Sequence, residues 1–387
     1  MYRLLQCVVH SLGKQPGTRV YLQGGLITIV ACFVMQRIQG IDSIRFICAL
    51  VVVLFHFGLI KEILFGPDPQ GWLLWLKTGL SYLFNGPAAV IVFFVISGFC
   101  IHFPSRNRPS MNLFSYFSRR LVRVGLPALI ALVVWLEAGV KPTCEDPGIF
   151  WSVICELAYY LLYPILLPVG LRIGWPTLIA ISQVVAFGLA AGHLSDIQRI
   201  TGGYPAFGWL NWIVGLPCWI SGCWLAEIFE TFPEPGTCTI WFYRSAVFVV
   251  SVAIQAARFQ IASPWVGTPF TLNLFSVLAV SWLGLEIAYR RTRPAPSILE
   301  WAGQRSYSLY LMHPAVPSLF VITNWLKPAV FGSLEKIILV MASLPVAYVF
   351  YLLVEAPSHR IAVTLGKHFE SANRGVRQVQ AVQEGWR

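Results

Sequence analysis

The stretch that decides the fold is residues 41–60, IDSIRFICALVVVLFHFGLI, an apolar run with an arginine near its start and a histidine near its end. Arg45 and His56 are eleven residues apart, so on an α-helix their side chains lie about 16 Å apart along the axis and within about 20° of the same face. Ionisable groups inside a membrane span are costly and usually functional. Arg45 and His56 are therefore the first candidate site residues.

The composition predicts that this stretch crosses a membrane. Of the 387 residues, 57% are hydrophobic and 12% are charged, whereas about 25% charged is typical of soluble domains, and the mean hydropathy is +0.67. At about 20 apolar residues per spanning helix, the chain has room for ten spans. The expected fold class is an all-α integral membrane protein with about ten transmembrane helices around a polar cavity and both ends cytoplasmic.

Each apolar run is expected to be a helix, because lipid offers no hydrogen-bond partner for open backbone. If the segment before Asp42 is cytoplasmic, 21 of the 28 Lys and Arg residues fall in inside segments, which agrees with the positive-inside rule. The runs are residues 44–60, 84–103, 121–136, 150–169, 177–191, 208–229, 242–257, 270–289, 306–326 and 336–354.

Three segments are expected along the chain. Residues 1–40 are interpreted as a cytoplasmic leader, with Met35 as an alternative start. Its apolar part, residues 20–34, resembles a signal-type segment or an interfacial helix. Residues 41–357 are expected to form the membrane domain and residues 358–387 a basic cytoplasmic tail.

Several classes of protein lack support in the sequence. The net charge of +11 comes from basic residues scattered between apolar runs, which indicates topology signals rather than a nucleic-acid site. The nine cysteines form no CxxC motif and are expected to be small core residues. The sequence contains no HExxH, no Cys/His metal spacing and no glycine-rich phosphate loop, so we expect no metal site.

Five segments follow one another along the chain: IDSIRFICALVVVLFHF (41–57), FFVISGF (93–99), SRRLVRV (118–124), WSVICELAYYLLYP (151–164) and SYSLYLMHP (306–314). Together, and in this order, they resemble the membrane-bound acyltransferase family 3, of the carbohydrate O-acetyltransferase type. The resemblance implies transfer of an acyl group, usually acetyl from cytoplasmic acetyl-CoA, to a carbohydrate at the far side of a bacterial plasma (inner) membrane. About 30 polar residues follow the last span, so the C-terminal SGNH domain of some members is expected to be absent.

His56 is the candidate general base, because an imidazole titrates near neutrality and can take a proton from a hydroxyl and return one to a thiolate. The alternative is a histidine bonded inside the bundle. Arg45 is expected to hold donor phosphate or orient the site, although an arginine at a span end also fixes depth by snorkelling. Asp42 is expected to be the helix N-cap.

Arg119, Arg120 and Arg123 are candidate ligands for the phosphates of coenzyme A. Arg120 and Arg123 are three residues apart and share a helical face, and the guanidinium fork suits phosphate. The resemblance agrees, since the family's paired arginines here are thought to meet the donor. The alternative is a plain topology signal.

Glu156 is a carboxylate within an apolar run, with Tyr160 at i+4 and Tyr163 at i+7. It is expected to be protonated or paired with Arg or His. As a candidate catalytic residue it would orient His56 or shape the acceptor site, and the alternative is a structural buried pair. The commoner family pattern has a second acid where Leu157 stands, which puts a two-acid role in doubt. Tyr160 is a candidate ligand for the acceptor.

The polar stripe Ser306, Tyr310 and His313 is expected to face the interior of the bundle. His313 is a candidate second acid/base or acceptor ligand, Tyr310 is a candidate acceptor ligand, and the alternative is a structural role. Ser97 beside Gly98 is expected to be a close-packing site rather than a nucleophile. Glu355, near Arg360, is interpreted as an anchor at the end of the last span.

The sequence therefore predicts a membrane-embedded O-acyltransferase, with acyl-CoA, a carbohydrate acceptor and membrane lipid as partners and no nucleic acid. The acceptor is left open between exopolysaccharide, lipopolysaccharide O-antigen and smaller glycosides, and succinyl is an alternative to acetyl. The other class is a transporter or flippase for a glycan or lipid-linked intermediate, since intramembrane Arg, His and Glu also mark substrate pathways. The absence of an internal sequence repeat argues against it.

Overall fold

The computed structural model describes residues 18–23, 26–31, 38–58, 70–106, 111–142, 148–199, 207–208, 210–261, 263–322 and 334–384. The chain divides into two compact units, Met1–Gln39 and Gly40–Arg387. Met35, the alternative start, lies outside the described residues.

The described part of the first unit is an antiparallel hairpin of β1 (Thr18–Gln23) and β2 (Leu26–Ala31). The expectation of an interfacial helix in residues 20–34 was wrong for the described residues. The reason lies in local preferences: β2 carries the β-branched run Ile27 to Val30, which favours strands, and Gly24–Gly25 between the strands disfavours a helix.

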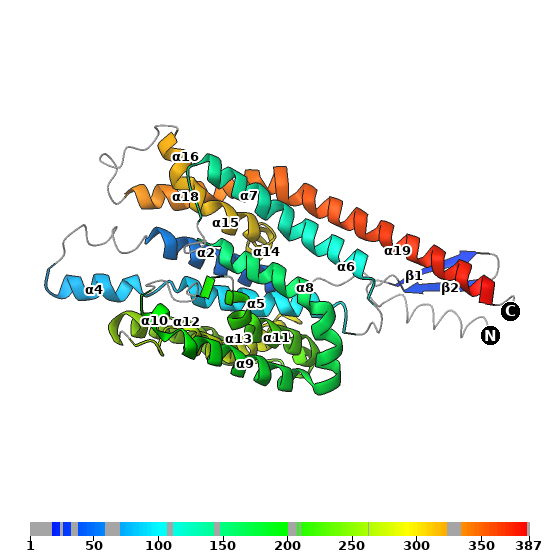
Figure 1. Cartoon of the computed structure of the whole chain (residues 1–387), viewed down its shortest axis with the longest axis horizontal. Helices are drawn as coiled ribbons and strands as arrows, with labels where there is room; N and C mark the ends of the chain where they lie inside the picture. The colour runs from blue at the N-terminus through cyan, green and yellow to red at the C-terminus, as the bar shows by residue number, and fades with distance from the viewer. Residues whose placement is uncertain are drawn as a thin grey trace. The chain divides into compact units, whose positions relative to one another are not determined.

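The described residues of the second unit form a helical bundle (Figure 1). Two short π-helical segments, η1 (Leu121–Gly125) and η5 (Tyr351–Glu355), interrupt longer helices, and η3 (Phe229–Thr231) and η4 (His313–Ala315) are 3-10 turns. The α-helices are α2 (Ile41–Phe57), α4 (Trp72–Ser81), α5 (Gly86–His102), α6 (Leu113–Arg120), α7 (Leu126–Glu137), α8 (Phe150–Ile173), α9 (Trp175–Gly192), α10 (Leu194–Arg199), α11 (Asn211–Ile228), α12 (Thr237–Ile261), α13 (Pro269–Arg290), α14 (Ser297–Gly303), α15 (Ser306–Met312), α16 (Val316–Ile322), α18 (Leu334–Phe350) and α19 (Ala356–Glu384).

The expected all-α membrane class is confirmed for the bundle. Seven stretches of described helix are long and apolar enough to cross a membrane. The other three expected runs coincide with α2, with η1 and α7, and with α15 to α16, and their crossing stays a prediction. The seven stretches are Trp72–His102, Phe150–Ile173, Trp175–Gly192, Asn211–Thr231, Thr237–Ile261, Pro269–Arg290 and Glu335–Glu370.

Helix α5 packs closely against α11 and also contacts α2 and α13. A Cβ added to Gly98 would lie 2.0 Å from the carbonyl oxygen of Trp219, and one added to Gly222 would lie 1.9 Å from that of Val95. The two backbones therefore touch, as small residues allow in membrane bundles. The expectation that Gly98 marks a close-packing site is confirmed.

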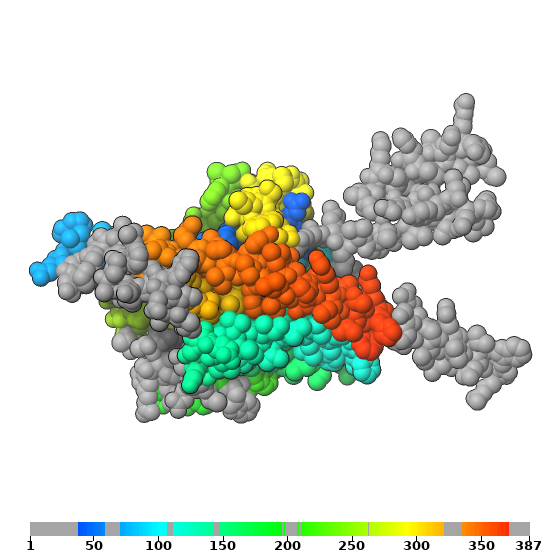
Figure 2. All heavy atoms as spheres, turned by 90° about the horizontal axis from the view of Figure 1, so that it is seen from above, coloured from blue at the N-terminus to red at the C-terminus, as the bar shows by residue number. Residues whose placement is uncertain are grey.

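The segment expected to be a basic tail begins as a helix. Helix α19 continues from α18 through η5 and packs along α6, and Figure 2 shows this orange-to-red helix lying beside the green-blue surface of α6 and α7. Asn112 donates a hydrogen bond from its side chain to the carbonyl of Phe369 over 3.2 Å, and the rings of Phe114 and Phe369 are 5.9 Å apart.

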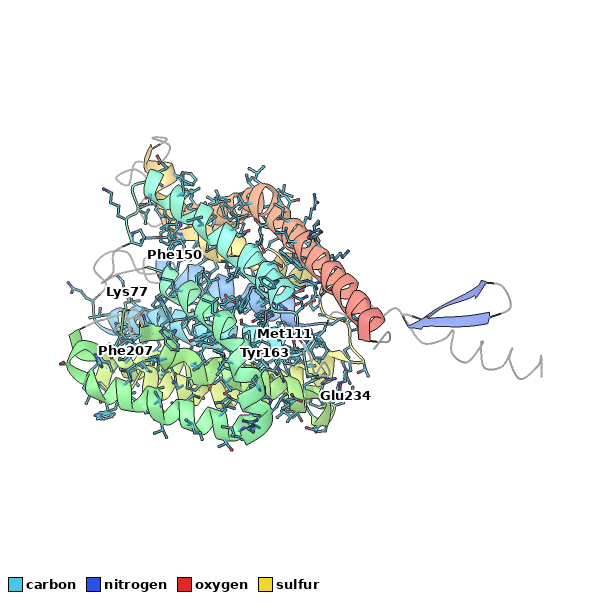
Figure 3. The ribbon with its side chains drawn as sticks, turned by 45° about the vertical axis from the view of Figure 1, so that its right-hand side comes forward. Lys77, Met111, Phe150, Tyr163, Phe207 and Glu234 are labelled. Carbon is cyan, nitrogen blue, oxygen red and sulfur yellow. The ribbon has the colours of Figure 1, made fainter. Side chains whose placement is uncertain are left out.

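The two ends of the bundle carry different side chains. In Figure 3, Met111, Tyr163 and Glu234 lie toward one end, and Lys77 and Phe207 toward the other. We call the first the arginine end, because Glu234 there accepts hydrogen bonds from Thr292 at 2.6 Å and Arg293 at 2.5 Å. These bonds, first that of Thr292, lower the pKa of the exposed Glu234 carboxyl.

Candidate functional site

Helix α2 carries both members of the first predicted pair. Arg45 lies one turn from its start and His56 lies in its last turn, so the prediction that one helix holds both residues is confirmed. The expectation for Asp42 was wrong. The N-cap residue is Gly40, and Asp42 lies in the first turn with its carboxylate 3.9 Å from the guanidinium of Arg45.

His56 lies against a second histidine from a distant part of the chain. Its Nδ1 is 3.0 Å from Nε2 of His313, the first residue of η4, and the two rings are stacked with centroids 5.1 Å apart. His313 is fully buried, whereas His56 is exposed. We call these two residues the histidine pair.

The contacts of His313 fix the tautomers of the histidine pair. Nδ1 of His313 is 2.8 Å from the carbonyl oxygen of Tyr310, and a carbonyl only accepts, so this nitrogen carries the proton. In a neutral His313, Nε2 is then the acceptor, and Nδ1 of His56 donates to it. The lone pair of a neutral His56 is consequently on Nε2, the atom that would take up a proton.

Tyr310 packs beside the histidine pair and is itself held by α8. Its hydroxyl lies 2.6 Å from that of Ser152 on α8, and its ring centroid is 6.1 Å from that of His313. Phe93 on α5 packs edge-on against the Tyr310 ring. The predicted stripe on residues 306–313 therefore faces the interior, and its last member reaches His56.

Three arginines gather toward the arginine end, at the junction of α2, α5 and α6. Arg45, Arg120 and Arg123 all interact electrostatically with the thiol of Cys100 on α5. Arg123 also interacts with Arg45 and Arg120. Among the residues that the structure describes, neither Arg120 nor Arg123 forms an ion pair. We call Arg45, Arg120 and Arg123 the arginine cluster.

The backbone at the arginine cluster departs from an α-helix. Arg123 lies in the π-helical segment η1, between α6 and α7, and such bulges often mark functional sites. The hydroxyl of Tyr307 on α15 donates to the carbonyl of Val124 over 2.9 Å, which satisfies a backbone acceptor of the bulge. The bulge changes how Arg123 is aimed relative to Arg120 on the preceding helix.

Arg119 is directed elsewhere. Its guanidinium forms an ion pair with Glu370 of α19 at 2.7 Å, and Glu370 also accepts from the hydroxyl of Ser115. A Cβ at Gly366 would lie 2.2 Å from Nε of Arg119, so the arginine lies directly over α19. The structure thus separates Arg119 from the two arginines with which the sequence grouped it.

Glu156 is the centre of a hydrogen-bonded group on α8, α5 and α11. Its Oε1 accepts from the hydroxyl of Ser97 at 2.9 Å and from the hydroxyl of Tyr160, and Nε1 of Trp219 donates to Ser97 over 3.1 Å. Arg45 interacts electrostatically with both Glu156 and Tyr160. Glu156 is therefore hydrogen-bonded to Ser97 and Tyr160 on the side of Arg45, while His56 has His313 as its partner.

Comparisons with known proteins bear on this geometry. The family model described as an acyltransferase domain, Acyl_transf_3, matches residues 38–136, which hold Arg45, His56 and the arginines of α6 and η1. Residues 38–136 are therefore similar to this family of membrane acyltransferases. The curated protein "Acyltransferase MdmB" of Streptomyces mycarofaciens is 24% identical over 328 residues, covering 72% of this chain and 78% of that protein. No solved structure matches.

Other candidate residues lie beyond the matched range, among them Glu156, Tyr160, Tyr310 and His313. The structure brings them to the matched helices from α8, α15 and η4. Tyr163, which the sequence placed on the stripe of Glu156, belongs to a different group: its hydroxyl is 2.8 Å from Nδ1 of the buried His102.

Sequence reasoning interpreted Glu355 as an anchor and did not name it as a candidate site residue. It lies in the π-helical segment η5, where Oε2 accepts from the backbone N–H of Ser308 at 3.1 Å and from its hydroxyl at 2.5 Å. It interacts electrostatically with Arg45 and Arg123. A carboxylate at the end of an apolar run was the available signal.

The described residues contain no group of three or more His, Cys, Asp or Glu side chains placed to hold a metal ion. Four of the six described cysteines are buried, namely Cys48, Cys155, Cys218 and Cys223, in keeping with their expected place in the core. The chemistry that the described side chains offer is proton transfer at the histidine pair and anion binding at the arginine cluster.

Proposed function

We propose that this acyltransferase moves an acetyl group from cytoplasmic acetyl-CoA to a hydroxyl of a cell-surface or exported carbohydrate. The observation that carries the proposal is the arrangement of α2, with a cation of the arginine cluster near its start and the histidine pair at its end. Acetyl-CoA has phosphates at one end and a thioester at the other, so its phosphates could bind the arginine cluster while its thioester reaches the histidine pair.

Arg120 and Arg123 would bind the phosphates of the donor from the cytoplasmic side. Charge-assisted hydrogen bonds from arginine to phosphate are about twice as strong as neutral ones, and among the described residues no carboxylate lies within ion-pair distance of either guanidinium. Arg45, already near Asp42 and Glu156, would position the donor rather than supply its main binding charge.

His56 would act as the general base. Its Nε2 takes the proton from the acceptor hydroxyl as the oxygen attacks the thioester carbon. The C–S bond then breaks, and the same nitrogen returns the proton to the departing thiolate. The products are the acetate ester and coenzyme A, so atoms and charge balance without an acyl-enzyme. General base catalysis of this kind contributes roughly 10²- to 10⁴-fold.

His313, Tyr310 and Tyr160 would serve the acceptor side and the positioning of the base. His313 holds the tautomer of His56 through the 3.0 Å contact, and Tyr310 fixes His313 through its backbone carbonyl. Tyr160 lies between Glu156 and Ser97 and offers a hydroxyl to the acceptor. We place the enzyme in the plasma membrane of a bacterium as a multi-pass protein.

The test is acetyl transfer from radiolabelled acetyl-CoA to surface glycans in membranes that contain the protein. His56→Ala at matched expression is the test variant. His193→Ala is the control, because the His193 ring contacts the Leu189 carbonyl on α9 and the Phe207 ring and lies outside the candidate site. We expect transfer by the wild type and the control, and transfer slowed by roughly 10²- to 10⁴-fold in His56→Ala.

Three other outcomes would change the proposal. Transfer by His56→Ala at the wild-type rate would disprove the mechanism. Transfer of labelled succinyl but not acetyl would change the donor. If no form transfers label while glycan export depends on the protein, the transporter interpretation would replace the enzyme.

A further inference from the structure

The first turn of α2 is held by a carboxylate from a distant helix. Oε1 of Glu300 on α14 accepts three hydrogen bonds: from the backbone N–H of Gly40 at 3.1 Å, from that of Ser43 at 2.9 Å and from the Ser43 hydroxyl at 2.5 Å. Helix starts leave such N–H groups without intrahelical partners. Glu300 therefore performs the capping that a residue of α2 itself usually provides.

Two further contacts fix the same turn. A Cβ at Gly303 of α14 would lie 1.8 Å from the carbonyl oxygen of Asp42, so the backbones of α14 and α2 touch. Gly40 has φ of 92°, and a Cβ there would lie 2.9 Å from the Arg290 side chain. Arg290 is itself held by Glu286, at 2.9 Å. The start of α2 is thus clamped between α13 and α14.

The cap has a consequence for the arginine cluster. Because Glu300 occupies the first-turn N–H groups, Asp42 is not used as a cap, and its carboxylate lies beside the guanidinium of Arg45. Without Glu300, Asp42 or Ser43 would be the nearest replacement cap, and either change would move the turn from which Arg45 extends. Glu300 therefore sets the position of Arg45 without contacting it, through the turn that it caps.

We propose that Glu300 is a positioning residue for donor binding, which acts on acyl-CoA through Arg45 by capping α2 from α14. The inference rests on the proposed function, since it assigns Glu300 a role in binding the same donor. Nothing in the motifs of the sequence points to Glu300, because its partners are about 260 residues away in the chain.

The experiment measures binding of acetyl-CoA to the purified full-length protein in detergent by isothermal titration calorimetry. Glu300→Ala is expected to raise the dissociation constant by roughly 2- to 30-fold, the range spanned by loss of a helix cap. Glu300→Gln keeps an oxygen acceptor of the same reach and is expected to restore most of the affinity. Glu234→Ala, which removes another carboxylate at the arginine end that bonds Thr292 and Arg293, is the matched control.

An Arg45→Lys background separates positioning from general damage. If Glu300 acts through Arg45, Glu300→Ala changes the dissociation constant much less in that background than in the wild type, because coupled residues are not additive. Thermal unfolding of each variant identifies any that fail to fold. If Glu300→Ala does not fold, Glu300→Gln replaces it. Its dissociation constant for acetyl-CoA is then compared with that of the wild type, with and without Arg45→Lys.

The outcomes keep the two proposals distinct. Wild-type protein that binds neither acetyl-CoA nor coenzyme A would overturn the proposed donor and this inference with it. Wild-type binding with an unchanged constant in folded Glu300→Ala would overturn the inference alone. An equal loss of affinity with and without Arg45→Lys would also overturn it, since Glu300 would then act by a route other than Arg45.

Discussion

Arg119, Arg120 and Arg123 look alike in the sequence but have different surroundings. Arg119 is paired with Glu370, and both side chains are 39% exposed, whereas Arg120 and Arg123 interact with Cys100. A charged hydrogen bond to phosphate contributes about 1.5–3 kcal/mol. We predict that Arg120→Ala and Arg123→Ala each raise the KM for acetyl-CoA roughly 10- to 100-fold, and that Arg119→Ala, the matched control, changes it little. Equal effects of all three substitutions on KM would contradict this assignment.

His313 is expected to act through His56. In a double-mutant cycle of His56→Ala and His313→Ala, assayed by acetyl transfer in membranes, we expect a coupling free energy of about 0.5–3 kcal/mol, as found for residues in contact. His313→Ala alone should lower kcat more than it raises KM for the donor, because the arginine cluster is unchanged. Additive effects on kcat would show that the 3.0 Å contact between the rings has no part in catalysis.

The partner of each polar side chain was the hardest feature to predict. Arg45 and His56 could be placed on one helix because helical geometry relates residues eleven apart. No local rule relates His56 to His313, Ser43 to the distant cap Glu300, or Glu355 to Ser308. These contacts arise from tertiary packing, which the sequence pattern of a single span does not encode.

Helices α5 and α11 cross with their backbones in contact, and this crossing gives a test of stability. Gly98→Ala would place a methyl group 2.0 Å from the carbonyl oxygen of Trp219, and Gly222→Ala would place one 1.9 Å from that of Val95. Because these oxygens belong to the backbone of a packed helix, they cannot easily move aside. Overpacking costs about 1–3 kcal/mol, so both variants should unfold at lower temperature in detergent. Gly188→Ala on α9 meets nothing within 4 Å and should unfold at or slightly above the wild-type temperature. A wild-type unfolding temperature for Gly98→Ala would contradict the crossing.

Apolar periodicity was sufficient for most helices and failed where local chemistry intervened. The run in residues 20–34 is apolar enough to suggest a helix, yet its described part pairs as β1 and β2. Residues 121–125 and 351–355 read as ordinary helix, but both form π-helical segments. A single extra residue per turn leaves no signature in hydrophobicity, so these bulges could not be predicted from the apolar pattern.

The orientation of the whole bundle remains a prediction, and the two ends make it testable. The Lys and Arg bias places the arginine end in the cytoplasm. Trp72 on α4 is 70% exposed, and α4 lies at the opposite end (Figure 1). In a background without native cysteines, Trp72→Cys should react with a membrane-impermeant maleimide on intact cells, and Glu234→Cys only after permeabilisation. Labelling of Glu234→Cys on intact cells would show that the predicted orientation is wrong and that the arginine end faces outward.

The contact between α5 and α11 also bears on attempts to alter this enzyme. Ser97 and Trp219, which bond one another beside Glu156, are immediate neighbours of the positions where the backbones touch, Gly98 and Gly222. Random mutagenesis across these helices would therefore discard most variants through misfolding before their chemistry was sampled. Libraries aimed at new acceptors should leave this crossing intact and diversify the surroundings of Tyr310 and His56, where the same helices are not pressed together.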